Sequence, residues 1–235
     1  MSEAASPELW VERLGVVPYS QALELQRGIA RQRIDGSIPE DVLLLLEHPP
    51  VVTLGRSSKE KHLLASPELL RARGVELFEV ERGGDVTFHG EGQLVGYPII
   101  DLKRHKRDLH WYLRQVEEAL IVALGALGIA AERSPGYTGV WTAGRKIASI
   151  GVHARDWVTW HGFALNVSTD LRFFDLIVPC GIQSVTMTSV SQELGHPVSV
   201  AEVTSVVAAS FGTTFGLHPR DVARFAIPEF VISHG

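Results

Sequence analysis

The stretch from residue 140 to residue 167, VWTAGRKIASIGVHARDWVTWHGFALNV, carries the clearest signal for the fold. Breaks at Gly144 and at Arg155-Asp156 divide it into apolar runs that cover residues 140–142, 147–153 and 157–167. Short apolar runs joined by turn residues predict consecutive strands that pair as an antiparallel meander. We therefore expect a sheet that contains antiparallel strands.

Strand and helix patterns also occur on both sides of this stretch. Strand patterns cover 11–17, 42–54 as one buried strand with a kink at 48–50, 75–80, 86–88 and 94–95. Helix patterns cover 18–36, 66–74, 108–128 and 199–215. Asp108 and the Ser199/Glu202 pair predict the N-terminal caps of the last two helices. Strands that cluster together favour a mixed or antiparallel sheet over regular strand–helix alternation.

The chain shows no sign of division into separate domains. It contains no internal repeat, low-complexity tract or linker. Its 235 residues, 45% of them hydrophobic, can bury a substantial core. We predict one α+β domain over residues 1–235, with its core at about 11–215 and a mixed or antiparallel sheet flanked by helices.

Charge, apolar runs and cysteine content exclude several classes of protein. A net charge of -5 and a pI near 6.1 give no basic field for nucleic acid. No apolar run approaches the roughly 20 residues that a membrane helix needs. One cysteine cannot form an internal disulfide, and the N-terminus lacks a signal-peptide pattern. We expect a cytoplasmic protein that binds neither nucleic acid nor membrane.

Cys180, the only cysteine, lies in the segment PCG at 179–181. The proline and the glycine predict a turn rather than a helix interior or a central strand. A lone cysteine is more often a small buried apolar residue than a nucleophile, and a turn leaves both roles open. A nucleophile must be a thiolate, so an ordinary thiol with a pKa of about 8.5 needs a nearby cation.

Lys146 is the first cation to consider. It begins an apolar strand in GRKIASIG at 144–151, where small residues allow a backbone or a ligand to come close. In an extended segment Arg145 and Lys146 point to opposite faces, so that one can face a site and the other solvent. The structural alternative is a solvated lysine in a turn.

Glycines crowd the segment RGGDVTFHGEGQ at 82–93. They indicate a backbone that turns tightly or is closely approached, although an ordinary hairpin with a structural His89 has the same pattern. The segment matches neither G-x-G-x-x-G nor G-x-x-x-x-G-K-[ST], so these motifs give no support for nucleotide binding.

Two further features need an interpretation. The basic run KRHKR at 103–107 is either a solvated loop or a docking patch for an acidic partner. The ten histidines include no HExxH motif and no Cys/His zinc spacing, so we expect no metal.

Together these segments resemble the lipoyl(octanoyl) transferases, which share a catalytic-domain superfamily with the lipoate and biotin protein ligases. The resemblance rests on RGGDVTFHGEGQL at 82–94, GRKIASIG at 144–151, HGFALNV at 161–167, and PCGI at 179–182 followed by Thr188-Ser189. The segments follow the family's order, and the similarity spans roughly 11–215. Glu91 departs from the pattern, in which we associate proline with this position, and alters a turn rather than a reactive group.

The resemblance implies transfer of an octanoyl group from acyl carrier protein to a lysine of a lipoyl domain. The implied acceptors are the lipoyl domains of 2-oxoacid dehydrogenase complexes and the glycine cleavage H protein. No cofactor is implied, because exchange of one thioester for another needs no activation. The implied fold is that of the biotin and lipoate protein ligase catalytic domain.

This chemistry suggests roles for the site residues. Cys180 would form a thioester acyl-enzyme, and Lys146 would stabilise the thiolate and then act as general acid and base. The backbone N–H groups of Gly181 and Ile182 would bind the oxyanion. The residues expected to bind substrate are Arg82, Gly83, Gly84, Thr87, His89, Gly90, Gln93, Ala148, Ser149, Ile150, Gly151, His161, Gly162, Ala164 and Gly181.

Three rival functions remain open. An ATP-dependent lipoate or biotin ligase would share the glycine-rich segment and the strand lysine but needs no thiol nucleophile. An amidotransferase that moves octanoyl between lipoyl proteins would keep the cysteine. A non-catalytic module that binds acyl groups or carriers would leave Cys180 as an inert thiol.

Overall fold

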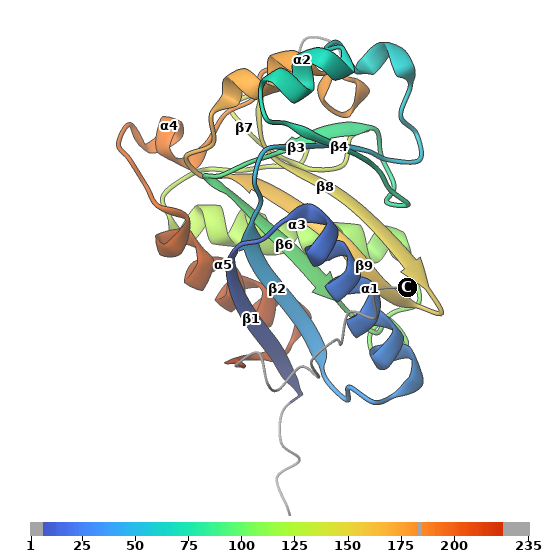
Figure 1. The fold of residues 1–235 in the computed structure, drawn as a ribbon. Helices are drawn as coiled ribbons and strands as arrows, with labels where there is room; N and C mark the ends of the chain where they lie inside the picture. Colours follow the sequence, from blue (N-terminus) through green and yellow to red (C-terminus); the bar gives the residue numbers. More distant parts are fainter. Residues whose placement is uncertain (1–6, 183–184, 223–235) are drawn as a thin grey trace, which may run out of the picture.

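The computed structural model describes residues 7–182 and 185–222 and contains two sheets over these ranges. The large sheet has the strand order β10-β1-β2-β6-β9-β8-β7, and the small sheet has the order β4-β3-β5 (Figure 1). The large sheet consists of β1 (Glu8–Val16), β2 (Asp41–Glu47), β6 (Gln93–Ile99), β7 (Val140–Thr142), β8 (Arg145–Arg155), β9 (Val158–Asn166) and β10 (His218–Asp221). The small sheet consists of β3 (Val51–Leu54), β4 (Glu76–Glu79) and β5 (Val86–His89).

The large sheet is mixed. Strands β7, β8 and β9 pair antiparallel in sequence order, as the stretch 140–167 predicted. Strand β6 pairs antiparallel with β9 and β2, whereas β1 runs parallel to β2 and β10. The predicted α+β class with a mixed sheet is confirmed.

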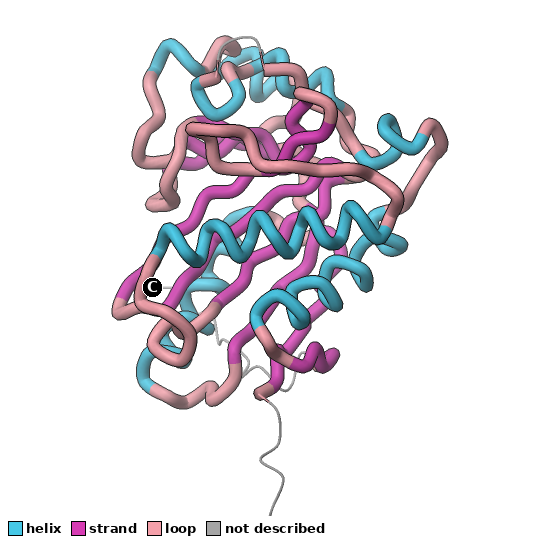
Figure 2. Tube along the Cα trace, turned by 180° about the vertical axis from the view of Figure 1, so that it is seen from behind, coloured by secondary structure: helices cyan, strands magenta, loops and turns pink. Residues whose placement is uncertain are grey.

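Helices cover both faces of the large sheet, with α1 on one face and α3 and α5 on the other (Figures 1 and 2). The α-helices are α1 (Tyr19–Asp35), α2 (Pro67–Ala72), α3 (Leu109–Ala126), α4 (Val190–Leu194) and α5 (Val200–Phe215). Leu44 of β2 belongs to the apolar core with Ile29 of α1. The preceding Leu43 belongs to the core with Leu120 of α3. Successive strand residues point to opposite faces, so β2 contributes to both cores.

The predicted helix caps are present. The side chain of Asp108 accepts a hydrogen bond from Trp111 N at the start of α3. Ser199 and Glu202 form a reciprocal capping box at the start of α5. Both N-terminal caps predicted from local sequence are therefore confirmed.

The prediction of one kinked strand over 42–54 is wrong. The segment forms β2 in the large sheet and β3 in the small sheet. Pro49 and Pro50 lie between them, and a proline has no N–H to donate to a strand ladder. Pairing therefore stops, and the chain passes from one sheet to the other.

Two strand boundaries also differ from expectation. Strand β10 contains Pro219 and lies beyond residue 215, where the last of the predicted patterns ends. Its place at the sheet edge, beside β1, explains why a proline is tolerated there. Strand β9 begins at Val158 because Asp156 and Trp157, with φ of 50° and 66°, form the turn that follows β8.

Some predictions cannot be compared with the structure. Residues 1–6, 183–184 and 223–235 lie outside the described ranges, and the expectation that the N-terminus lacks a signal peptide falls on the first of these segments. The extent of the domain over residues 1–235 stays a prediction. Within the described ranges, no helix combines the length and apolar character needed to cross a membrane.

Candidate active site

Cys180 lies on a tight 3₁₀ turn formed by Pro179–Gly181. Its backbone has φ 54° and ψ 22°, a left-handed conformation that is uncommon for a residue with a side chain. Gly181 follows with φ 67°. The predicted turn is confirmed, and strain of this kind in a non-glycine residue tends to occur at functional sites.

The approach to this turn is held by the segment around a second 3₁₀ turn, Glu60–His62. Val178 N donates a hydrogen bond to the carbonyl of His62 at 2.7 Å. Two backbone N–H groups of the same segment, at residues 64 and 65, donate to the carbonyl of Leu176 at 2.9 and 3.0 Å. The cysteine turn is therefore anchored to a distant part of the sequence.

Gly181 is needed for space as well as for its backbone angle. His62 Nδ1 lies 2.6 Å from Asp85 Oδ2, and this pair packs against Gly181. A Cβ atom at position 181 would lie 2.5 Å from Asp85 Oδ2 and 3.0 Å from His62 Cε1. A side chain here would displace either the Asp85–His62 pair or the turn that carries Cys180.

Lys146 is fully buried and contacts the cysteine, with Nζ 3.0 Å from Cys180 Sγ. Its carbonyl accepts a hydrogen bond from Thr188 N at 2.9 Å, which fixes the start of β8. Arg145 forms an ion pair with Glu193 at 2.8 Å and is partly exposed. The side chains of Arg145 and Lys146 therefore differ in exposure, as predicted. The structure thus excludes a solvated Lys146 and brings the two predicted catalytic residues together.

The charges around Cys180 favour its thiolate. Burial alone raises the pKa of the Cys180 thiol, but the Lys146 ammonium lowers it through its charge and its hydrogen bond. Ser149, whose Oγ lies 3.8 Å from Sγ, and the charge of Arg82 lower it further. The net result is a Cys180 pKa below that of an ordinary thiol, as a nucleophile requires.

The glycine-rich segment packs directly on β8. Gly83 N donates a hydrogen bond to the carbonyl of Val152 at 2.8 Å, and a Cβ at Gly151 would lie 2.8 Å from the Gly83 oxygen. Arg82 is buried, and its guanidinium donates to the carbonyl and the hydroxyl of Thr53 at 2.7 and 2.8 Å. The glycines therefore allow one backbone to lie against another.

His89 belongs to a chain of buried hydrogen bonds. Its Nδ1 lies 2.8 Å from Gln93 Oε1, and Gln93 Nε2 donates to Asn166 Oδ1 at 2.9 Å. Asn166 Nδ2 in turn donates to the carbonyl of Thr188 at 3.0 Å. Burial lowers the pKa of His89 to about 3, so the ring is neutral at physiological pH. The chain links the glycine-rich segment to Thr188, the residue that also bonds Lys146.

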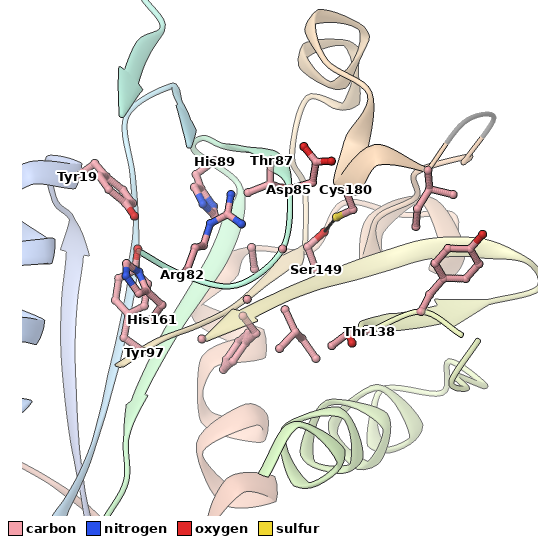
Figure 3. A pocket seen from close by; sticks show the side chains of 18 of the residues that line it. Tyr19, Arg82, Asp85, Thr87, His89, Tyr97, Thr138, Ser149, His161 and Cys180 are labelled. Atoms are coloured by element: carbon pink, nitrogen blue, oxygen red, sulfur yellow. Dashed lines mark hydrogen bonds between the residues drawn. The ribbon is translucent and has the colours of Figure 1, made fainter. Parts of the chain in front are cut away.

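These elements surround a cavity of about 200 Å³. The predicted residues that line it are Arg82, Gly84, Thr87, His89, Ser149, Ile150, Gly151, His161, Gly162, Ala164, Cys180 and Ile182. The predicted residues outside the lining are Gly83, Gly90, Gln93, Lys146, Ala148 and Gly181. Figure 3 shows Cys180 and Ser149 together, while Tyr19, Tyr97 and His161 gather at a distance from them. Their roles in catalysis and binding stay predictions.

Part of the lining could not be found from the sequence. The unpredicted residues are Tyr19, Asp85, Tyr97, Gly136, Tyr137, Thr138 and Phe163. Asp85 and Phe163 lie inside the motifs at 82–94 and 161–167. Their position beside predicted site residues could have marked them as part of the lining. The others belong to ordinary helix, strand or turn patterns, and only the tertiary fold brings them to the cavity.

The expected oxyanion donors are already engaged. Gly181 N donates to the carbonyl of Val178 at 2.9 Å, and Ile182 N donates to the carbonyl of Pro179 at 3.0 Å. Both bonds lie inside the turn that carries the cysteine. Neither N–H group is free to bind an oxyanion in this conformation, contrary to the expectation from sequence.

The basic run at 103–107 is matched by acidic side chains. The ion pairs are Lys103 with Asp101, Arg104 with Glu40, and Lys106 with Asp108. His105 Nε2 lies only 2.8 Å from the buried carboxylate of Asp41. These contacts favour the structural interpretation of the run, and its use as a docking patch stays a prediction.

Comparison with known proteins identifies the family. The family model described as the lipoyl protein ligase A/B catalytic domain matches residues 18–212. The chain belongs to this family. Curated relatives include the octanoyltransferase of Rubrobacter xylanophilus, 52% identical over 209 residues that cover 88% of this chain and 93% of the relative. The octanoyltransferase of Gloeobacter violaceus is 50% identical over 203 residues, covering 86% and 88%. The resemblance found in the sequence is confirmed.

Solved structures of lipoate protein ligases share the fold of this member of the lipoyl protein ligase A/B family. A lipoate-protein ligase A bound with ATP has a TM-score of 0.74 at 19% identity, covering 94% of this chain and 92% of that one. A bi-partite lipoate protein ligase from Thermoplasma acidophilum has a TM-score of 0.72 at 18% identity, covering 94% and 90%. At these identities the match shows the fold alone, and the predicted ligase-type fold is confirmed.

Proposed function

We propose that the protein transfers an octanoyl group from acyl carrier protein to a lysine of a lipoyl domain through a thioester on Cys180. The observation that carries the proposal is the 3.0 Å contact between Lys146 Nζ and Cys180 Sγ beside a cavity. Relatives named octanoyltransferase, 50% and 52% identical, support the choice of acyl group. An ATP-dependent ligase would have no use for this thiol–ammonium pair.

The cavity suits a linear acyl chain. Ile150, Phe163 and Ala164 line it and give its wall an apolar part that can bury methylene groups. Cys180 lines the same cavity, so a thioester on Sγ would place the chain inside it. The polar residues gathered away from the cysteine would then surround the distal part of the chain or the water beyond it.

In the first half-reaction the Cys180 thiolate attacks the thioester carbonyl of the octanoyl carrier. A bond forms between Sγ and the carbonyl carbon, and the bond to the carrier's sulfur breaks. The departing sulfur takes a proton from Lys146 Nζ and leaves as a thiol. The products are the octanoyl-enzyme and a neutral Lys146 amine.

In the second half-reaction the neutral amine of the acceptor lysine attacks the carbonyl carbon of the octanoyl-enzyme. Its nitrogen gives one proton to Lys146 Nζ as the amide bond forms and the bond to Sγ breaks. Cys180 leaves as a thiolate, so the ammonium–thiolate pair is restored. One residue thus serves as acid in one half-reaction and as base in the other.

The oxyanion of each tetrahedral intermediate needs donors other than the engaged N–H groups of the turn. Lys146 Nζ and Ser149 Oγ lie 3.0 and 3.8 Å from Sγ and are the polar groups in contact with the reacting atom. We assign them to the oxyanion, which forms on the carbon attached to Sγ. We also propose that the protein is located in the cytoplasm. The reaction uses the two protein substrates and needs no cofactor.

Intact-mass spectrometry tests this function directly. The purified protein is incubated with octanoyl carrier alone, and an apo lipoyl domain is added afterwards without ATP. We expect an octanoyl adduct on the wild type, no adduct on Cys180→Ala, and movement of the adduct to the lipoyl domain. An unmodified wild type that still acylates the lipoyl domain would contradict the covalent mechanism. Acylation that requires ATP and free octanoate would identify a ligase instead.

A further inference from the structure

The Lys146 ammonium has unusual surroundings for a buried charge. The residue has no exposed surface, and a charge removed from water is costly unless other groups compensate it. Among residues 7–182 and 185–222, no carboxylate forms an ion pair with it. Its hydrogen-bond partner is Cys180 Sγ at 3.0 Å, and that partner is negative only while the thiol is ionised.

The second group in contact with this charge is an aromatic ring. Lys146 Nζ lies 5.0 Å from the centroid of the Trp141 ring, within the range of a cation–π interaction. The face of an indole ring attracts a cation more strongly than any other aromatic side chain. Trp141 is itself buried, so water does not screen the contact.

The backbone around Trp141 holds the ring in this position. Trp141 N donates to the carbonyl of Glu132 at 2.9 Å, and Glu132 N donates back to the carbonyl of Trp141 at 2.8 Å. Gly139 leaves the space that both side chains occupy, because a Cβ there would lie 2.9 Å from Lys146 Cε and 3.2 Å from Trp141 Cη2. The ring and the lysine stem are thus packed together.

We propose that Trp141 is a positioning residue that stabilises the Lys146 ammonium through its ring face and thereby supports the reactive thiolate of Cys180. This inference rests on the proposed acyl transfer and adds to it a residue that does not line the cavity. Trp141 does not touch the substrate, and it acts through Lys146 alone.

The contact has different consequences in the two half-reactions. Before acylation, the ring and the thiolate both stabilise the ammonium, so loss of the ring shifts the pair toward neutral amine and neutral thiol. Acylation then slows, because less thiolate is present. After acylation the thiolate is gone, and Lys146 must be neutral to accept a proton. Loss of the ring favours that neutral form, so the second half-reaction is not slowed.

The test uses the full-length protein with Trp141→Phe, Trp141→Leu and fluorinated tryptophans placed at position 141. Fluorination withdraws electron density from the ring face and keeps its shape, so it separates the cation–π contact from packing. Trp111→Leu is the matched control, since Trp111 is a partly buried tryptophan of α3 that packs against Phe215. Thermal unfolding establishes which variants are folded.

Iodoacetamide alkylation of Cys180 as a function of pH is the first measurement, and it requires no acyl transfer. We expect the pH midpoint of the alkylation rate to rise as position 141 changes from tryptophan to fluorinated tryptophan, phenylalanine and leucine. In Trp111→Leu this midpoint should stay at the wild-type value. Single-turnover acylation by octanoyl carrier at neutral pH should fall by about 30-fold in Trp141→Leu, the loss expected for a desolvated cation–π contact. Discharge of the octanoyl-enzyme to a lipoyl domain should keep at least the wild-type rate.

Two outcomes would overturn the inference. One is an alkylation profile that does not respond to graded fluorination in folded protein. The other is an equal loss in both half-reactions with an unmoved alkylation profile, which would indicate that Trp141 only supports the local structure. A shifted alkylation profile in a protein that transfers no acyl group would uphold the Trp141 contact while contradicting the proposed function.

Discussion

Two basic regions of this molecule, the run at 103–107 and Lys146, differ in how their charges are compensated. In the run, Lys103, Arg104 and Lys106 form ion pairs with carboxylates, and His105 contacts the carboxylate of Asp41. Lys146 is fully buried and contacts a thiol and an aromatic ring instead. The more strongly basic stretch of sequence is therefore the electrostatically satisfied one.

The contrast shows which charge the protein can use. A cation held by carboxylates has its field cancelled locally and serves mainly to fix a loop. A buried ammonium beside a thiol has a partner only when the thiol ionises, so it drives that ionisation. The net lowering of the Cys180 pKa, in spite of burial, is the result of this arrangement.

The largest effect should follow from removing the Lys146 charge. Lys146→Met keeps the length of the apolar stem and abolishes both the counter-charge and the acid–base group. We expect kcat/KM for octanoyl transfer to fall by about 10³-fold, within the range of a lost general acid–base residue. Arg145→Met is the matched control, because Arg145 is the neighbouring cation paired with Glu193, and its transfer rate should stay within a few-fold of wild type. Equal losses in both variants would contradict the distinction between the two cations.

The next largest effect should follow from moving the nucleophile. Gly181→Ala places a Cβ only 2.5 Å from Asp85 Oδ2. It also forces an alanine into the left-handed backbone conformation at φ 67°. We expect transfer to fall by about 10²-fold, since a displacement near 1 Å has that effect on aligned reactants. Gly128→Ala is the control: its φ is 86°, but no atom lies within 4 Å of the added Cβ. Gly128→Ala should lose about 1–2 kcal/mol of stability and keep its transfer activity. Equal losses of transfer activity in the two variants would show that the Asp85–His62 contact does not position Cys180.

The basic run should affect stability more than transfer. His105→Gln removes the hydrogen bond to the buried Asp41 carboxylate, and we expect a loss of about 2 kcal/mol in the free energy of unfolding. Lys106→Gln removes an exposed pair and should change that free energy by about 0.5 kcal/mol or less. Urea unfolding measures both. A fall in the rate with octanoyl carrier at low salt, without loss of stability, would instead support the docking patch.

His89 is a buried titratable group that stays neutral, in contrast to Lys146. His89 has a folded pKa of about 3 against an ordinary value of 6.5, so the unfolded chain binds its proton first as the pH falls. Its contribution to stability is present above about pH 6.5 and is lost as the pH falls toward 3, at about 1.4 kcal/mol per pH unit. His89→Asn should reduce this slope in urea unfolding between neutral pH and pH 5. An unchanged slope would indicate that the pKa of His89 is the same in the folded and the unfolded protein.

Much of the fold was predictable because its signals are local. The meander 140–167, the cap at Asp108 and the capping box at Ser199 all follow from residues that are neighbours in sequence. The division of 42–54 between two sheets was not predicted, because it depends on where the partner strands lie. The edge strand at 218–221 was hidden by its proline, which only an edge position tolerates.

The site was predictable to the extent that motifs mark it. Turn residues, strand position and glycine spacing made Cys180, Lys146 and the glycine-rich segment candidates, and the family resemblance implied their roles. Tyr19 and Tyr97 reach the cavity from an ordinary helix and an ordinary strand, so no local pattern marks them. The engagement of the Gly181 and Ile182 N–H groups was not predicted, because the hydrogen bonds inside a 3₁₀ turn depend on its backbone angles.

The pH dependence of Cys180 alkylation, compared in wild type and Lys146→Met, tests the pairing of these two residues most directly. Iodoacetamide reacts with the thiolate, so its rate reports ionisation without any acyl substrate. The structure predicts a wild-type midpoint below that of a free thiol and a Lys146→Met midpoint above it, since burial then acts without the ammonium. The same midpoint in both proteins would contradict the role of Lys146 as the counter-charge of the nucleophile.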